Sequence, residues 1–252
     1  MHNTVLKRLV TAAVVLVAAA GVGAGELTVS AASSLTNAFK EVAQHYQAQY
    51  PDARVALNFG ASGALLQQMA KGAPVDVFAS ADQETMDQAE KLGLVAAGAR
   101  RDFVRNTLVL IAPTDATPVV RQLADLGQPA VQRIAIGNPA SVPVGRYTRH
   151  ALEAAKLWPL VQAKAIQTQN VRQSLDYVAR GEVDAGFVYA TDAALMAGKV
   201  RVVQEVPLDM AIRYPMASVH GSAHGAEATR FMAYVLSPAG QAVLAKYGFG
   251  QP

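Results

Sequence analysis

Apolar residues recur along the chain in two alternating patterns, short β-rich runs and longer stretches with helical spacing. Residues 26–31 (ELTVSA) alternate apolar and polar side chains, which predicts a strand. Leu35, Phe39 and Val42 follow at spacings of three and four, which predicts a helix that ends at Pro51. Because a strand followed by a helix recurs along the chain, the sequence predicts βα units around parallel sheets.

The same patterns predict about nine strands in all. The further strands are expected at residues 54–59, 74–80, 107–112, 133–136, 165–168, 185–190, 200–206 and 216–219. Helices are expected after residue 62, from 81 to about 93, from the turn at 138–145 through Trp158, at 171–180, and as a final pair broken at Ser237-Pro238. This number of strands fits two small α/β domains better than one sheet.

The N-terminal segment, residues 1–24, has the composition of a secretory signal peptide. Lys7 and Arg8 precede an apolar run at 9–20, and small residues follow at 22–24. The run is shorter than the roughly 20 apolar residues of a transmembrane helix. We expect this segment to be removed on export.

Composition and charge exclude several classes of function. The chain has 252 residues and no cysteine, which excludes disulfides, thiolate metal sites, a cysteine nucleophile and a lipid on cysteine. The formal net charge of +3 includes Lys7 and Arg8, so the exported protein is nearly neutral and no nucleic-acid surface is expected. The bacterial periplasm is the expected location.

Few residues form a pattern typical of catalysis or metal binding. His220 and His224 have helical spacing, but neighbouring glycines favour a loop and no Glu or Cys completes a metal site. The turn at residues 60–63 (GASG) resembles a nucleophile elbow built on Ser62, except that Ala64 stands where a glycine is required. A secreted α/β serine hydrolase using Ser62 remains the alternative from another class.

Small or polar residues start several predicted helices directly after strands. These starts are Ser33-Ser34, residues 60–63, residues 143–145 (PVG) and Asn170-Val171. Each one alone is most simply a helix cap. Together they would gather unpaired N–H groups and helix dipoles at one sheet edge, an arrangement that binds an anion without Arg or Lys.

Several segments together resemble the periplasmic molybdate-binding proteins of ABC importers. They are residues 31–39 (AASSLTNAF), 59–63 (FGASG), 72–83 (GAPVDVFASADQ), 137–147 (GNPASVPVGRY), 170–172 (NVR), 181–189 (GEVDAGFVY) and 246–249 (KYGF). They span nearly the whole exported chain in the family order.

The resemblance implies a fold, a ligand and a partner. The fold is an α/β, two-domain periplasmic binding protein (type II, Venus-flytrap), with a mainly parallel sheet flanked by helices in each lobe. We expect lobe 1 at residues 25–105 with 214–252, and lobe 2 at 106–213. The protein would be a monomer and no enzyme, without a cofactor, that passes molybdate or tungstate to the membrane permease of an ABC importer.

The resemblance also implies a ligand set. Ser34 and Ser62 would bind through hydroxyl and backbone N–H, Val144 and Val171 through backbone N–H, and Tyr189 through its hydroxyl. Molybdenum would be bound only as molybdate, through these residues. Ser33 could take the place of Ser34, but Ser34 is favoured. Because carboxylates would repel a dianion, Asp82 is interpreted as a helix cap, and Asp76 and Asp184 as structural.

A site made only of donors predicts which oxyanions bind. Molybdate, tungstate and sulfate carry no proton at neutral pH, whereas the proton of hydrogen phosphate would be left unpaired. Sulfate is smaller, so its oxygens would not reach donors spaced for molybdate. Molybdate and tungstate are nearly equal in size, so the sequence does not predict which of the two is preferred. A protein that binds another oxyanion, such as sulfate, is the alternative of the same functional class.

Overall fold

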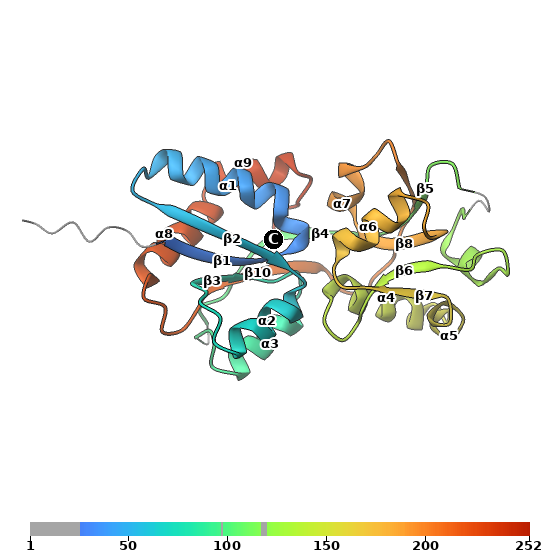
Figure 1. The fold of residues 1–252 in the computed structure, drawn as a ribbon, viewed down its shortest axis with the longest axis horizontal. Helices are drawn as coiled ribbons and strands as arrows, with labels where there is room; N and C mark the ends of the chain where they lie inside the picture. The colour runs from blue at the N-terminus through green and yellow to red at the C-terminus, as the bar shows by residue number, and fades with distance from the viewer. Residues whose placement is uncertain (1–25, 97, 117–119) are drawn as a thin grey trace, which may run out of the picture.

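A computed structural model describes residues 26–96, 98–116 and 120–252. The expected signal peptide, residues 1–24, lies outside them. Two five-stranded sheets each form the centre of a lobe, and the lobes lie side by side (Figure 1). The described residues contain no helix that is long and apolar enough to cross a membrane.

Lobe 1 is built on a sheet with strand order β2-β1-β3-β10-β4. Its strands are β1 (Glu26–Ala32), β2 (Arg54–Gly60), β3 (Val77–Ala79), β4 (Arg101–Asn106) and β10 (Ile212–Ser218). Its helices are α1 (Thr36–Gln49), α2 (Ser62–Ala70), α3 (Gln83–Lys91), α8 (Gly225–Leu236) and α9 (Pro238–Lys246), with the 3-10 turn η1 (Ser33–Leu35) before α1. α1, α8 and α9 pack together on one face of the sheet, and α2 and α3 cover the other (Figure 1).

Lobe 2 is built on a sheet with strand order β7-β6-β8-β5-β9. Its strands are β5 (Leu108–Pro113), β6 (Ile134–Gly137), β7 (Ala165–Thr168), β8 (Ala185–Tyr189) and β9 (Val200–Glu205). Its helices are α4 (Pro143–Ala154), α5 (Trp158–Gln162), α6 (Val171–Ala179) and α7 (Ala190–Leu195), with the 3-10 helix η2 (Leu123–Gly127). α4 and α5 lie on the opposite side of the sheet from α6 and α7 (Figure 1).

Each sheet has four strands that run in one direction and one that runs against them. The reversed strand is β10 in lobe 1 and β5 in lobe 2. The chain crosses between the sheets at Thr107, which separates β4 from β5, and again at residues 206–211, between β9 and β10. The lobe limits given above stay a prediction.

The alternation of strands and helices is confirmed, and the differences have local causes. β4 and α7 were not predicted, so the described residues contain ten strands. The helix predicted through Trp158 is wrong, because the chain turns at Lys156, whose φ of 58° is left-handed, and α5 starts afresh. No side chain caps η1 or α1, so the predicted serine cap at Ser33-Ser34 is also wrong.

Candidate functional site

Ser34 and Ser62 follow two neighbouring parallel strands of lobe 1. Ala32, at the end of β1, pairs with Gly60, at the end of β2, and each serine lies two residues beyond its member of that pair. Both serines are buried, Ser34 in η1 and Ser62 as the first residue of α2. The parallel pairing therefore places both at the same edge of the sheet.

Val144, Val171 and Tyr189 follow the three adjacent parallel strands of lobe 2. Val144 is the second residue of α4, after β6, and Val171 is the first residue of α6, after β7. Tyr189 is the last residue of β8. Because β6 pairs in parallel with both β7 and β8, all three residues lie at the carboxyl edge of this sheet, and all are buried.

Two contacts between the lobes bring these edges together. The backbone N–H of Gly63 donates to the carbonyl oxygen of Ser141 at 3.0 Å, which joins the start of α2 to the turn before α4. Arg172, next to Val171, donates from Nη2 to the carbonyl oxygen of Ser34 at 3.1 Å. The two lobes are therefore closed against each other at the ends that carry the candidate residues.

Tyr189 is joined to Ser34 through a second tyrosine. Its ring centroid lies 5.8 Å from that of Tyr214, in an edge contact. The hydroxyl of Tyr214 lies 3.0 Å from Ser34 Oγ. The structure thus gathers all five sequence-predicted residues around the boundary between the lobes.

The five residues share an unused capacity to donate hydrogen bonds. In the described part of the chain, the backbone N–H groups of Ser34, Ser62, Val144 and Val171 donate to no other residue. They lie in the first turn of η1, α2, α4 and α6, where N–H groups have no acceptor within the helix. The hydroxyl of Tyr189 is fully buried and also has no partner among the described residues. Buried donors without acceptors are rare and each costs about 1–3 kcal/mol, so their convergence indicates a place where an acceptor binds.

Burial fixes the protonation state of Tyr189. It raises the pKa of the Tyr189 hydroxyl well above its usual value of 10, with Tyr214 and Tyr147 adding to the shift. The phenol therefore keeps its proton at neutral pH and can act as a donor. Three α-helix N-termini, those of α2, α4 and α6, add partial positive charge beside it.

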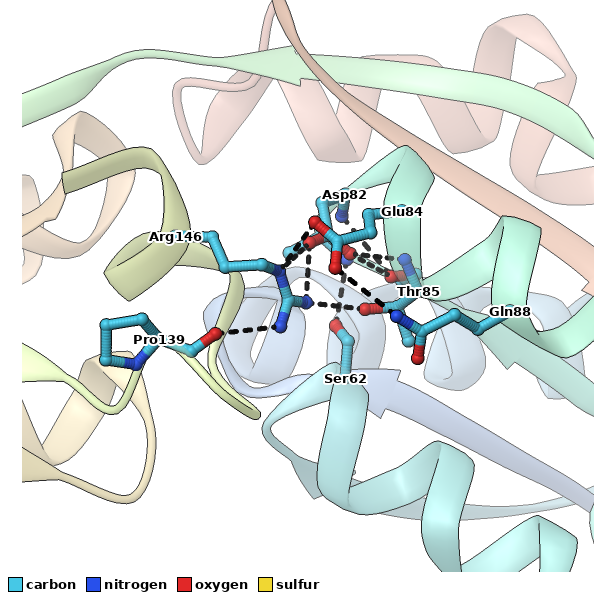
Figure 2. Close-up of polar contacts among 9 residues, drawn as sticks. Ser62, Asp82, Glu84, Thr85, Gln88, Pro139 and Arg146 are labelled. Carbon is cyan, nitrogen blue, oxygen red and sulfur yellow. Dashed lines mark hydrogen bonds and ion pairs between the residues drawn. The ribbon is translucent and has the colours of Figure 1, made fainter. Parts of the chain in front are cut away.

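A charged contact between the lobes lies next to Ser62. Arg146 of α4 donates to Asp82 Oδ2 from Nε at 2.8 Å and from Nη2 at 2.6 Å, and from Nη2 to Thr85 Oγ1 at 2.7 Å (Figure 2). Asp82 also accepts from the N–H of Thr85, so its interpretation as a helix cap is confirmed. The positive charge of Arg146 balances that of the Asp82 carboxylate, and this ion pair stabilises the closed arrangement of the two lobes.

A second buried carboxylate lies beside Val171. Asp192 of α7 accepts from Arg172 Nε at 2.5 Å and is fully buried. Burial raises the pKa of this carboxyl to about 6, although Arg172 opposes the shift. Arg172 also donates to Asn37 Oδ1 of lobe 1 at 2.8 Å, so its charge is shared across the boundary.

The remaining acidic candidates are structural. Asp76 accepts from the N–H of Thr28 at 2.7 Å, and His224 lies 3.3 Å from its carboxylate. Asp184 accepts from two backbone N–H groups, those of residues 132 and 133. Among the described residues no group of three or more His, Cys, Asp or Glu could hold a metal ion.

Ser62 is not placed like the nucleophile of a serine hydrolase. Its Oγ accepts from the N–H of Ala81 at 3.0 Å. In the described ranges, no histidine is hydrogen-bonded to it. An oxygen that accepts from a backbone N–H keeps its own hydrogen free to donate, which suits an anion ligand.

Sequence reasoning missed two residues of the site. Tyr214, from β10, contacts Ser34, and Asn106, the last residue of β4, donates to the Tyr214 hydroxyl at 3.2 Å. Both belong to strands next to the crossings, far from Ser34 in sequence. The only available signal was the polar Asn106 at the end of a strand, and β4 itself was not predicted.

Known proteins share this sequence and fold. A family profile described as bacterial extracellular solute-binding protein matches residues 27–250. A chain named as a substrate-binding lipoprotein of an ABC transporter in Bacillus subtilis (strain 168) is 36% identical over 225 residues, which cover 88% of this chain and 85% of that one. The molybdate-binding protein ModA of Haemophilus influenzae is 34% identical over 229 residues, which cover 89% of each chain. The solved periplasmic molybdate-binding protein of Azotobacter vinelandii is 25% identical, with a TM-score of 0.79 over 90% of this chain and 99% of that one.

Proposed function

Because the chain belongs to the bacterial extracellular solute-binding protein family, we propose that it captures molybdate or tungstate and delivers it to the permease of an ABC importer. The ligands would be Ser34, Ser62, Val144, Val171 and Tyr189. Relatives whose names state that they bind molybdate, at about a third identity over nearly the full chain, support this choice of anion.

The observation that carries the proposal is the convergence of buried donors without acceptors. Four backbone N–H groups and the Tyr189 hydroxyl lack acceptors among the described residues. A tetrahedral oxyanion has four oxygens and can accept from all of them. Binding would therefore satisfy in one step the groups that folding leaves unsatisfied.

The kind of donor supports a fully deprotonated anion. Backbone N–H groups cannot accept, and Tyr189 keeps its proton because burial raises its pKa. The hydrogen of hydrogen phosphate would find no acceptor among the four backbone N–H groups. Sulfate offers the right charge without a proton, so its smaller size is the feature that would separate it from molybdate.

The proposed setting is the periplasm, with residues 1–24 removed on export. The family name places its members outside the cytoplasm, which supports export of this chain. We propose that the protein acts as a monomer without a cofactor, because the anion itself joins the two lobes and no second chain is needed to complete the site.

Titration calorimetry of the dialysed protein tests the proposal. Molybdate and tungstate are expected to bind at least about 100-fold more tightly than sulfate or phosphate, a gap of about 2.8 kcal/mol. Equal affinity for sulfate and molybdate would contradict the proposal and favour a general oxyanion binder. A protein that binds none of the four anions would overturn the proposed function altogether.

A further inference from the structure

The hydroxyl of Tyr214 contacts one of the proposed ligands, Ser34. The side chain is fully buried, and among the described residues its oxygen has two hydrogen-bonding partners, Ser34 Oγ at 3.0 Å and Asn106 Nδ2 at 3.2 Å. Two hydroxyls facing each other could be bonded in either direction. The third group, Asn106, settles which direction is used.

The backbone fixes the orientation of the Asn106 amide. Its Oδ1 accepts from the N–H of Thr107 at 2.9 Å, so the other end of the amide must be the NH₂ group. That NH₂ group has two hydrogens and faces two oxygens, Thr191 Oγ1 at 2.9 Å and the Tyr214 hydroxyl at 3.2 Å. Asn106 is therefore a donor to Tyr214.

A donor at Asn106 determines the direction of the next hydrogen bond. The Tyr214 oxygen accepts from Asn106, and its own hydrogen then needs an acceptor. Within the described residues, Ser34 Oγ is the one acceptor that lies within reach. If Ser34 donated to Tyr214 instead, the buried phenol hydrogen would have no partner, which is the costlier arrangement.

We propose that Asn106 and Tyr214 are positioning residues that hold Ser34 as a donor toward the anion and thereby select against protonated oxyanions. Because Ser34 Oγ already accepts from Tyr214, its hydrogen points away from Tyr214 and stays available to the ligand. This inference rests on the proposed function, since it concerns how that site distinguishes its ligand.

The chemistry of Tyr214 suits this role. Burial raises the pKa of its hydroxyl well above 10, so the phenol keeps the hydrogen that the chain of bonds requires. The bonds run from the Thr107 N–H through Asn106 and Tyr214 to Ser34, which leaves the Ser34 hydrogen as the one available to the ligand. A ligand oxygen without a proton accepts that hydrogen, whereas a ligand hydrogen facing Ser34 would meet another hydrogen.

The test compares phosphate with sulfate, which are similar in size and differ in one proton. At a pH where phosphate is the monohydrogen dianion, both anions compete against bound molybdate, and the ratio of their inhibition constants is measured. Tyr214→Phe removes the hydrogen that Ser34 accepts, so the Ser34 hydroxyl can turn its oxygen toward a ligand hydrogen. Asn106→Asp keeps the shape of the side chain but accepts from Tyr214, which turns the bond between Tyr214 and Ser34 around.

In both variants the ratio is expected to shift by about tenfold in favour of phosphate, because the ligand proton gains an acceptor. The added charge of Asn106→Asp affects both dianions alike and cancels in the ratio. Tyr234→Phe is the matched control, since Tyr234 is a buried tyrosine of the same lobe whose hydroxyl is hydrogen-bonded to neither Ser34 nor Asn106.

The two proposals fail in different ways. A wild-type protein that binds molybdate, combined with an unchanged ratio in both variants, overturns the positioning role alone. Equal weakening of phosphate and sulfate would likewise show that Tyr214 has only a structural role. A wild-type protein without oxyanion affinity overturns the proposed function and the positioning role with it.

Discussion

Arg146 and Asp82 form a buried ion pair across the boundary between the lobes. Arg146 Nη2 lies 2.6 Å from Asp82 Oδ2, and the two side chains are 16% and 5% exposed. Arg146 belongs to α4 of lobe 2, while Asp82 precedes α3 of lobe 1. Opening of the lobes would separate the pair, so its contribution belongs to the closed state.

Arg146→Met is therefore expected to weaken molybdate binding at least tenfold while leaving the thermal stability of the ligand-free protein nearly unchanged. In the closed state the variant leaves the Asp82 carboxylate buried without its partner, which is costly in protein interiors. In an open state water can solvate the same carboxylate. Calorimetry and a melting curve measure the two effects separately.

Arg149→Met serves as the control for that prediction. Arg149 is an exposed arginine of the same helix and pairs with Glu153 within lobe 2. The Arg149→Met variant should bind molybdate with the affinity of the wild type. Equal losses in the Arg146 and Arg149 variants would show that general positive charge, and not the contact with Asp82, matters for binding.

The backbone donor at Val171 can be removed on its own. Val171 is the first residue of α6, a position that proline favours, and Asn170 before it is extended, with φ of −165° and ψ of 169°. Val171→Pro deletes the N–H and preserves the helix. We expect binding to weaken by about 10- to 150-fold, which corresponds to the 1.5–3 kcal/mol of a hydrogen bond to a charged group.

Val171→Ala provides the comparison, because it shortens the same side chain but retains the N–H. Affinity for molybdate should stay close to that of the wild type. Calorimetry on the two variants measures the difference. If the alanine variant lost as much affinity as the proline variant, side-chain packing would be the cause and Val171 would have to leave the ligand set.

The two serines are expected to contribute through their side chains. Ser34→Ala and Ser62→Ala each remove a hydroxyl donor and should weaken molybdate binding by about 1.5–3 kcal/mol in calorimetry. Val144→Ala keeps its backbone N–H and should bind nearly as the wild type does. A large loss in the Val144 variant, beside no loss in the Ser62 variant, would contradict the assigned roles.

The sequence predicted those parts of the protein that depend on local chemistry. A strand that ends and a helix that begins within a few residues form a local pattern, so the helix starts at Ser62, Pro143 and Val171 were found without the fold. The carboxyl edges of parallel strands then place such starts together. That is why helix starts far apart in the chain could be assigned to one anion site, while the individual ligands came from the resemblance to the molybdate-binding proteins.

Contacts between distant side chains could not be predicted in this way. Arg146 is 64 residues from Asp82, and Tyr214 is 180 residues from Ser34. No local pattern records such pairs. The strand β4 was missed for a related reason, because its sequence RDFVRN alternates poorly and becomes a strand by pairing with β10.

Asp192 predicts a dependence of stability on pH. Burial raises the pKa of its carboxyl to about 6 in the folded protein, above the value of about 3.9 in an unfolded chain. Between these two pH values the Asp192 carboxyl is protonated in the folded state and ionised in the unfolded state. Its contribution to the free energy of unfolding therefore falls as the pH rises from about 4 to about 6. Melting temperatures of the wild type should decline over this range relative to those of Asp192→Asn; parallel profiles would contradict the assignment.

Closure itself can be tested at Gly63, whose backbone N–H donates to the Ser141 carbonyl oxygen of the other lobe. A Cβ on Gly63 would lie 2.6 Å from the carbonyl oxygen of Ser141, an impossible approach to backbone of the other lobe. Within α2 an alanine is favoured over glycine, so Gly63→Ala should not destabilise lobe 1. The variant separates the stability of a lobe from its ability to close.

We expect Gly63→Ala to fold normally, to bind molybdate at least tenfold more weakly, and to keep a larger radius of gyration in saturating molybdate than the wild type. Scattering with and without the anion measures this, because closing the lobes around the anion compacts the molecule. Gly225→Ala is the matched control, since nothing lies within 4 Å of the added Cβ. If the wild type showed no compaction while binding tightly, the ligand-free protein would already be closed, and the weakened binding of Gly63→Ala would then report distortion of the site and not a block to closure.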